Sequence, residues 1–321
     1  MQFYDIFNGD ADGICALHQL RLAEPVDAEL VTGLKHEVAL LDRVDAGAGD
    51  HVTVLDVSLD RNRAALARML DRGARVRYFD HHYAGIVPIH PGLEAHLDAT
   101  GQSCTSELVD RHLGGRFRRW AVVAAYGDNF PEAAARLADG LGLDAARLER
   151  LRALGEALNY NAYGATPADV LVAPVQLYRV VSRYADPVEL IDREPLVATL
   201  ERERAADLAR ALEVTGQRLS PGARAYELPN VAWSRRVLGT FANRLANEQP
   251  ARAHAVLVPL PDGGYVASVR VPRDCATSAV DFCRRYPGGG GRTTAAGVER
   301  LEAADVEAFL SAFGAAYPEP A

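Results

Sequence analysis

Two aspartates, Asp10 and Asp12, stand one residue apart in the segment "DIFNGDADGICALHQL", between an apolar run and a helix-like run. A carboxylate pair closed by Gly13 packs poorly and concentrates negative charge. Because such a concentration is costly without a counter-charge, the pair suggests that a cation binds there. The D-x-D-G pattern alone is weak evidence, since aspartate and glycine are ordinary turn residues.

Three further polar clusters follow apolar, strand-like runs. Asp56 closes "HVTVLDVSLD", Asp80, His81 and His82 close "RVRYFDHHYAG", and Asp128 follows the apolar run before "YGDNF". Each cluster taken singly is more typical of a helix cap or a surface loop. Together they suggest one site, because ligands of open α/β sheets bind beyond the carboxyl ends of the strands.

Electrostatics indicates what that site would hold. Several carboxylates at one place repel one another and take up protons unless a cation neutralises them. Oxygen ligands with one imidazole and no thiolate favour Mn²⁺ or Mg²⁺ over structural zinc. Two ions about 3.5–4 Å apart would clamp a phosphoryl group and supply a hydroxide nucleophile. We therefore expect two Mn²⁺ ions, with Mg²⁺ as an alternative.

The elements that must position these residues alternate along the first part of the chain. Short apolar strands followed by amphipathic helices indicate βαβ units and a parallel sheet. The expected strands are residues 2–7, 28–33, 51–57 and 75–80, and the expected helices are 13–23, 37–44 and 61–73.

The remainder of the chain is mostly helical at first. A helix capped by Ser103 or Thr105 is expected, and a long helix over 195–218 would join two domains, with its charges on a solvated face. A smaller α+β part follows, in which "PDGG" predicts a hairpin turn. The expected divisions are a catalytic domain (1–190), a helical linker (191–222) and a substrate-binding domain (223–321).

Composition excludes several classes of protein. The net charge of −8 argues against a broad nucleic-acid-binding face, and Lys35 is the single lysine, so an anionic ligand would rely on arginine, histidine or backbone amides. Four scattered cysteines without a C-x-x-C pair, no basic leader and no long apolar run predict a cytoplasmic protein with no membrane segment.

The four motifs, in order, resemble those of the DHH phosphoesterases: "DADG", the aspartate of "LDVSLD", "DHH" and "GDN". The later "YPGGGGRTTAAGV" is similar to the glycine-rich signature of their DHHA1 domain, and "VASVRV" is similar to the strand that carries a substrate-binding arginine. The resemblance covers nearly the whole chain. It implies a parallel-sheet DHH domain with a helical extension, a smaller DHHA1 domain and an active site in the cleft between them.

The resemblance also assigns roles to residues. His82 would face the scissile phosphate, Asp80 would orient its neighbours, and Asp56 would bridge the two ions. The implied metal ligands are Asp10, Asp12, Asp56, His81 and Asp128, and the implied substrate-binding residues of the second domain are Arg270, Gly290, Gly291 and Arg292.

Two positions depart from the family pattern. Ile6 stands where many members have a histidine four residues before the first aspartate, so coordination of the first ion is incomplete on this pattern. Arg292 stands where the glycine motif usually has histidine. The arginine would keep a phosphate contact and would add a permanent charge.

The leading hypothesis is therefore a Mn²⁺-dependent hydrolase of phosphodiester or phosphomonoester bonds in small nucleotides or short oligonucleotides. The acidic balance and an aromatic content of 7% argue against a long-strand exonuclease with a basic, stacking channel. That exonuclease, a cyclic-dinucleotide phosphodiesterase and an inactive nucleotide-binding sensor remain alternatives. A homodimer is one option.

Overall fold

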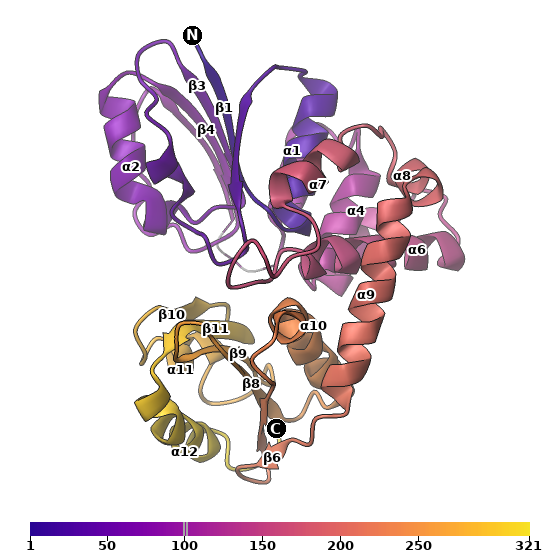
Figure 1. Ribbon diagram of the computed structural model, residues 1–321. Helices are drawn as coiled ribbons and strands as arrows, with labels where there is room; N and C mark the ends of the chain where they lie inside the picture. Colours follow the sequence, from indigo (N-terminus) through magenta and orange to yellow (C-terminus); the bar gives the residue numbers. More distant parts are fainter. Residues whose placement is uncertain (99, 101) are drawn as a thin grey trace. The chain divides into compact units, whose positions relative to one another are not determined.

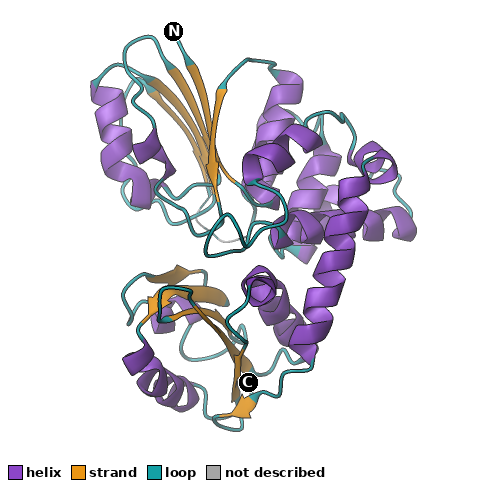
Figure 2. Ribbon diagram, viewed as in Figure 1, coloured by secondary structure: helices purple, strands orange, loops and turns teal. Residues whose placement is uncertain are grey.

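The chain forms two compact units in this computed structural model, which describes residues 1–98, 100 and 102–321. Unit 1 comprises residues 1–162 and 171–201, and unit 2 comprises residues 163–170 and 202–321 (Figure 1). Both units combine helices with a sheet, so the expected α/β class is confirmed (Figure 2).

Unit 1 is built on a five-stranded, all-parallel sheet with the strand order β2-β1-β3-β4-β5. Its strands are β1 (Phe3–Asn8), β2 (Glu29–Gly33), β3 (His51–Leu55), β4 (Arg75–Asp80) and β5 (Leu93–Leu97). The first four were expected from the sequence. The fifth lies at the edge of the sheet and is only partly buried, so it lacks the apolar run that marks the others.

Helices cover both faces of this sheet. Successive residues of a strand point to opposite faces, so each strand places apolar side chains against the helices on both sides. Ile6 packs with α2 (Leu59–Asp71), whereas Phe7 packs with α1 (Ala11–Ala23) and α4 (Arg118–Gly127). Figure 1 shows α2 on one side of the strands and α1 with α4 on the other. The remaining α-helices of unit 1 are α3 (Thr105–His112), α5 (Pro131–Ala138), α6 (Ala145–Tyr160), α7 (Pro174–Val181), α8 (Pro187–Arg193) and the first part of α9 (Pro195–Leu212).

The α-helix expected over 37–44 is wrong, since only a short 3₁₀ turn forms there, η1 (Leu40–Arg43). The reason is a side chain from α2. Asn62 Nδ2 donates to the Val38 carbonyl at 2.6 Å, and Asn62 Oδ1 accepts from the Leu41 amide at 3.1 Å. These bonds satisfy backbone groups that would otherwise need helical partners.

The long helix also ends earlier than expected, because α9 stops at Leu212. Residues 217 and 218, which the pattern placed in this helix, form the short edge strand β6 (Gln217–Arg218), paired antiparallel with β7 (Ala223–Glu227). Pairing with the sheet of unit 2 thus overrides helix propensity at the end of the segment.

Unit 2 contains a six-stranded mixed sheet with the order β10-β11-β9-β8-β7-β6. Helix α10 (Ala232–Glu248) packs on one face, and α11 (Ala279–Cys283) and α12 (Val306–Ala316) pack on the other. The other strands are β8 (Ala253–Pro259), β9 (Tyr265–Arg270), β10 (Gly289–Gly291) and β11 (Ala295–Leu301), and a 3₁₀ turn, η2 (Ala303–Asp305), precedes α12.

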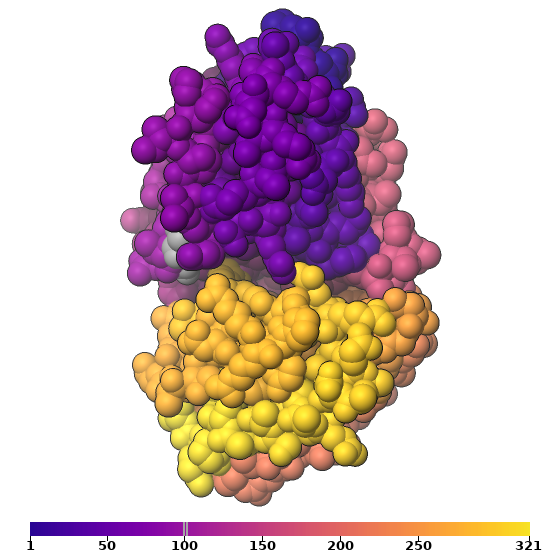
Figure 3. Space-filling model, turned by 90° about the vertical axis from the view of Figure 1, so that its left-hand side faces the viewer, coloured from indigo at the N-terminus to yellow at the C-terminus, as the bar shows by residue number. Residues whose placement is uncertain are grey.

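The hairpin expected at "PDGG" is confirmed, since β8 and β9 pair antiparallel and close with Pro259 opposite Tyr265. Gly263 and Gly264 both have positive φ, a backbone conformation that favours glycine. Much of the face of unit 2 seen in Figure 3 is formed by its C-terminal segments, coloured orange to yellow. Among the described residues, no helix has the length and apolar character needed to cross a membrane.

Candidate metal centre

The polar clusters noted in the sequence lie at one edge of the unit 1 sheet. Strands β1, β3 and β4 are adjacent and parallel, and at their carboxyl ends they lead into the segments that carry Asp10 with Asp12, Asp56, and Asp80 to His82. The helices that follow β1 and β3 cover opposite faces, so β1 and β3 flank a switch point of the kind where open α/β sheets bind ligands.

Asp10 is the N-terminal cap of α1 and is almost fully buried. Its Oδ1 accepts hydrogen bonds from the amides of Asp12 (3.0 Å) and Gly13 (3.1 Å), which caps the helix. A Cβ atom at Gly13 would lie 2.2 Å from the Asn8 carbonyl oxygen, so glycine is required where α1 starts beside β1. The cap leaves Oδ2 of Asp10 to accept from the ammonium of Lys35.

Asp12 is held by the first turn of α3. Its carboxylate oxygens accept from the amides of Thr105 and Ser106, each at 2.7 Å, and the Ser106 hydroxyl donates to the Asp12 carbonyl at 2.9 Å. The expected cap by Ser103 or Thr105 is wrong: α3 has Cys104 at its cap position, with no side-chain bond. A carboxylate from α1 instead satisfies the helix N–H groups.

Asp56 sits directly after β3 with a φ of +58°, an uncommon conformation for a residue with a side chain. It is buried, and its Oδ1 accepts from the Thr105 hydroxyl at 3.1 Å. Burial first, and then the neighbouring carboxylates, raise the pKa of Asp56 well above its usual value. Burial likewise raises the pKa of Asp12, although His81 opposes the shift. Both shifts disfavour the charged carboxylate at these positions.

His81 faces this carboxylate group with one nitrogen. Its Nδ1 lies 3.0 Å from the Ser103 carbonyl oxygen. Because a carbonyl only accepts, Nδ1 carries the proton and Nε2 is the nitrogen directed at the acids. Its Nε2 is near three carboxylates, at 3.3 Å (Asp56 Oδ1), 3.6 Å (Asp128 Oδ2) and 3.9 Å (Asp12 Oδ2). An imidazole nitrogen among three carboxylates requires a positive charge, supplied by a proton or by a metal ion.

Asp80 and His82 form a separate pair beside this group. Asp80 Oδ1 accepts from the His82 backbone amide at 3.2 Å and from His82 Nδ1 at 2.7 Å, while Asp80 Oδ2 accepts from the Leu59 amide at 3.3 Å. Partial burial would lower the pKa of His82, but Asp80 outweighs it and the pKa is raised. The His82 side chain is 42% exposed, so its ring is open to a ligand.

Asp128 reaches the group from the end of α4, where the following Asn129 has a φ of +59°. Its Oδ1 accepts from the Lys35 ammonium at 3.2 Å, and its Oδ2 faces His81. Lys35 was not expected in the site. Two features of the sequence could have pointed to it: it is the single lysine of the chain, and it lies two residues after β2, the neighbour of β1.

Two overlapping sets of side chains have ligand atoms within 4.8 Å of one another, as a metal site requires. They are Asp12, His81 and Asp128, and Asp56, His81 and His82. Carboxylate oxygens with imidazole nitrogen suit Mn²⁺ or Mg²⁺, and the anchoring of His81 Nδ1 on a carbonyl is the usual support of a metal-bound histidine. The residues present therefore fit a divalent ion.

The expected substrate-binding residues lie together in unit 2. Arg270 ends β9 and donates to Asn243 Oδ1 at 2.8 Å and to Ser268 Oγ at 3.0 Å. Arg270 is the register partner of Ala295, whose carbonyl accepts from the Arg292 amide at 2.7 Å. Gly290 and Gly291 form the strand β10 that leads into this turn. The arginines and glycines thus share one end of the sheet.

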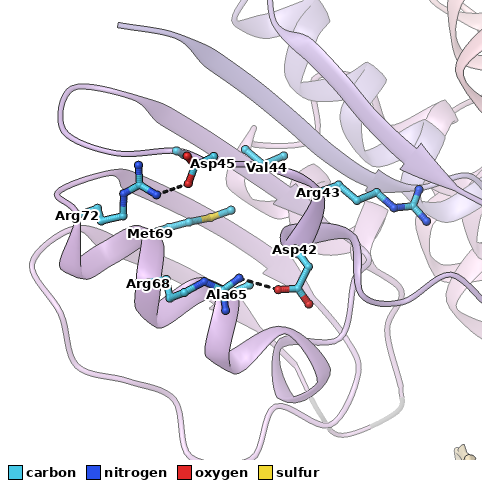
Figure 4. A pocket seen from close by; sticks show the side chains of 9 residues that line it. Asp42, Arg43, Val44, Asp45, Ala65, Arg68, Met69 and Arg72 are labelled. Atoms are coloured by element: carbon cyan, nitrogen blue, oxygen red, sulfur yellow. Dashed lines mark hydrogen bonds and ion pairs between the residues drawn. The ribbon is translucent and has the colours of Figure 1, made fainter.

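A pocket on unit 1 lies outside this group. Figure 4 shows it between η1 and α2, with the side chains of Asp42, Arg68 and Met69 along its walls. Arg68 donates to Asp42 at 2.6 Å, which ties the two elements together. No expected metal ligand is among the residues that line this pocket.

Comparison with known proteins found structural neighbours only. No family model and no curated protein matched the sequence. Exonuclease RecJ bound to manganese is similar over 99% of this chain and 91% of its own, with a TM-score of 0.63 and 17% identity. The chain has the fold of RecJ. RecJ from Thermus thermophilus in complex with Mn²⁺ has the same TM-score at 19% identity, and the match covers 99% of this chain but only 53% of that one.

A second kind of neighbour is a pGpG-specific phosphodiesterase, PggH from Vibrio cholerae. It matches 98% of this chain and 100% of its own at 13% identity, with a TM-score of 0.51. The resemblance to the DHH/DHHA1 phosphoesterases is thus confirmed at the level of the fold. The homodimer considered above gains no support from these neighbours.

Proposed function

We propose that this chain is a divalent-metal-dependent phosphoesterase that hydrolyses phosphodiester or phosphomonoester bonds in small nucleotides or short oligonucleotides. The observation that carries the proposal is the environment of His81. Its Nδ1 is fixed on a carbonyl, and its Nε2 is directed at three buried carboxylates that come from three separate segments of the chain. Such a set is expensive to maintain without a cation.

The chain's own residues divide into two roles under this proposal. Asp12, Asp56, His81 and Asp128 would hold the ion, which when bound supplies a Lewis acid for the phosphoryl oxygens and activates a water. His82 would contact the scissile phosphate through Nε2, because its Nδ1 is engaged by Asp80. With its pKa raised by Asp80, His82 would favour its charged form and so stabilise negative charge on the phosphate.

Unit 2 would bind the substrate. Arg270 and Arg292 are the charged groups proposed to contact its phosphates, and Gly290 and Gly291 would let the backbone approach it closely. The asparagine and serine contacts of Arg270 hold its guanidinium in one orientation. Mn²⁺ is the proposed ion, with Mg²⁺ as the alternative. The bridging role predicted for Asp56 holds only if two ions bind.

A small substrate is favoured over a long strand by two observations. The chain is acidic and has few aromatic residues, whereas long single strands need a basic groove with stacking side chains. The pGpG-specific phosphodiesterase, a neighbour named for a short substrate, is matched over its whole length. A RecJ-like exonuclease activity is the second candidate, favoured by the higher TM-score of that neighbour.

A competition assay tests the proposal. The purified chain is incubated with Mn²⁺, a labelled dinucleotide and a labelled strand of about 20 nucleotides in one reaction. The matched variants are Asp56→Asn, which tolerates the positive φ of this position, and Asp42→Asn on the exposed η1 turn.

We expect loss of the dinucleotide, at least a hundredfold slower with Asp56→Asn and unchanged with Asp42→Asn. Losing a direct ligand should cost at least as much as losing a group that supports a ligand, which typically costs roughly 10–100-fold. Shortening of the long strand would favour the exonuclease instead. Equal rates for the wild type and Asp56→Asn would refute the assigned centre.

A further inference from the structure

The single lysine of the chain lies inside the candidate centre. The Lys35 ammonium donates to Asp10 Oδ2, to Asp128 Oδ1 at 3.2 Å and to Asn159 Oδ1 at 3.2 Å. Asn159 belongs to α6 and is buried, so this partner comes from a fixed helix. An ammonium group has three donor hydrogens, so it can donate to all of these acceptors.

The segment that presents Lys35 is also fixed. The Lys35 amide donates to the Ala162 carbonyl at 3.0 Å, and the Leu34 amide donates to Glu37 Oε2 at 2.7 Å. The Lys35 side chain is only 26% exposed, which shields its ion pairs from water. The ammonium is therefore held in place by backbone contacts as well as by the acids.

The carboxylates of the centre divide between two positions of positive charge. Asp12 and Asp56 face His81, whereas Asp10 faces Lys35 and belongs to neither of the two sets of possible metal ligands that contain His81. Asp128 is shared, because its Oδ1 contacts the ammonium and its Oδ2 points to His81. The Lys35 ammonium thus supplies the positive charge at one position, and the His81 imidazole faces the carboxylates at the other.

We propose that the Lys35 ammonium takes the place of a second metal ion, so that the chain binds one divalent ion beside His81 and not two. The inference rests on the proposed metal-dependent function and deepens it. Lys35 acts as a positioning residue: it neutralises Asp10 and orients Asp128 toward the ion. A second divalent ion at Asp10 would lie against the ammonium, and like charges at contact distance repel strongly at a buried site.

Metal stoichiometry tests this directly. The metal-free full chain is titrated with Mn²⁺ by calorimetry, bound metal is counted after dialysis, and the electron paramagnetic resonance spectrum distinguishes an isolated Mn²⁺ from a coupled pair. The variants are Lys35→Met, which removes the charge, and Lys35→Arg, which keeps it. Arg68→Met is the matched control, since it removes one positive charge from an exposed ion pair of the same unit.

We expect one Mn²⁺ per chain and an isolated-ion spectrum for the wild type, Lys35→Arg and Arg68→Met, and two ions with a coupled spectrum for Lys35→Met. Two ions in the wild type, or a single ion in a folded Lys35→Met, would overturn the inference. If Lys35→Met fails to fold, the wild-type and Lys35→Arg counts alone decide it.

The outcomes also separate this inference from the function on which it rests. One bound Mn²⁺ without hydrolysis of any nucleotide would leave the stoichiometry standing and remove the proposed activity. No bound Mn²⁺ in the wild type would overturn both.

Discussion

Lowering the pH should reduce the free energy of unfolding of unit 1 through one buried histidine that takes no part in the candidate centre. His18 lies in α1, its Nε2 donates to the Tyr184 carbonyl at 2.7 Å, and its ring packs edge-on against Trp120 with centroids 4.7 Å apart. Burial lowers the pKa of His18 to about 4, against the weaker opposing effect of the Tyr184 carbonyl. The folded chain thus keeps this ring neutral.

The sign and size of the effect follow from linkage. The unfolded chain protonates His18 below about pH 6.5, whereas the folded chain keeps it neutral until the pH approaches 4. The free energy of unfolding is therefore unaffected above pH 6.5 and decreases as the pH falls toward 4. Between pH 7 and pH 5 the two pKa values imply a loss of about 2 kcal/mol in the free energy of unfolding of unit 1.

Urea titrations at pH 7 and pH 5 measure this loss. A Trp233→Phe background leaves Trp120, which packs against His18, as the fluorescence probe of unit 1. His18→Gln removes the titrating group, and His36→Gln is the control because His36 is exposed. Between pH 7 and pH 5 the free energy of unfolding should fall by about 2 kcal/mol more in the Trp233→Phe protein and in its His36→Gln variant than in its His18→Gln variant. Equal losses in all three proteins would refute the reasoning.

Other perturbations have equally definite outcomes. Arg21→Met removes the guanidinium whose Nε and Nη2 donate to the buried Asp5 carboxylate at 2.7 and 2.5 Å, and it should lower the free energy of unfolding by about 3 kcal/mol. Adding Asp5→Asn should recover part of this loss, and urea titration measures both changes. Gly155→Ala would place a Cβ atom 2.1 Å from the Val123 carbonyl oxygen, where α4 and α6 cross. A loss of about 2 kcal/mol or more should appear in a thermal melt. Thr105→Val removes a hydrogen bond to a proposed ligand carboxylate and should weaken Mn²⁺ binding about tenfold in calorimetry, with unfolding unchanged to within about 1 kcal/mol.

The sequence by itself determined where one group of polar side chains would meet. Parallel strands place their carboxyl ends at one edge, so residues that directly follow β1, β3 and β4 must converge once the strands are recognised. Asp10, Asp56 and His81 could be located in this way from short apolar runs alone. The β8–β9 hairpin was equally local, because glycines with positive φ specify the turn within four residues.

Only the tertiary structure decided which other residues complete the centre. The amides of Thr105 and Ser106 reach Asp12 across more than 90 positions of sequence, and Lys35 meets Asp128 across 93. No local pattern encodes such contacts, since they depend on how α3 and α4 pack around α1. The same holds for residues 37–44, where a side chain from α2 replaced the helix that their periodicity favoured. Local propensity amounts to tenths of a kcal/mol per residue, and hydrogen bonds to buried backbone groups outweigh it.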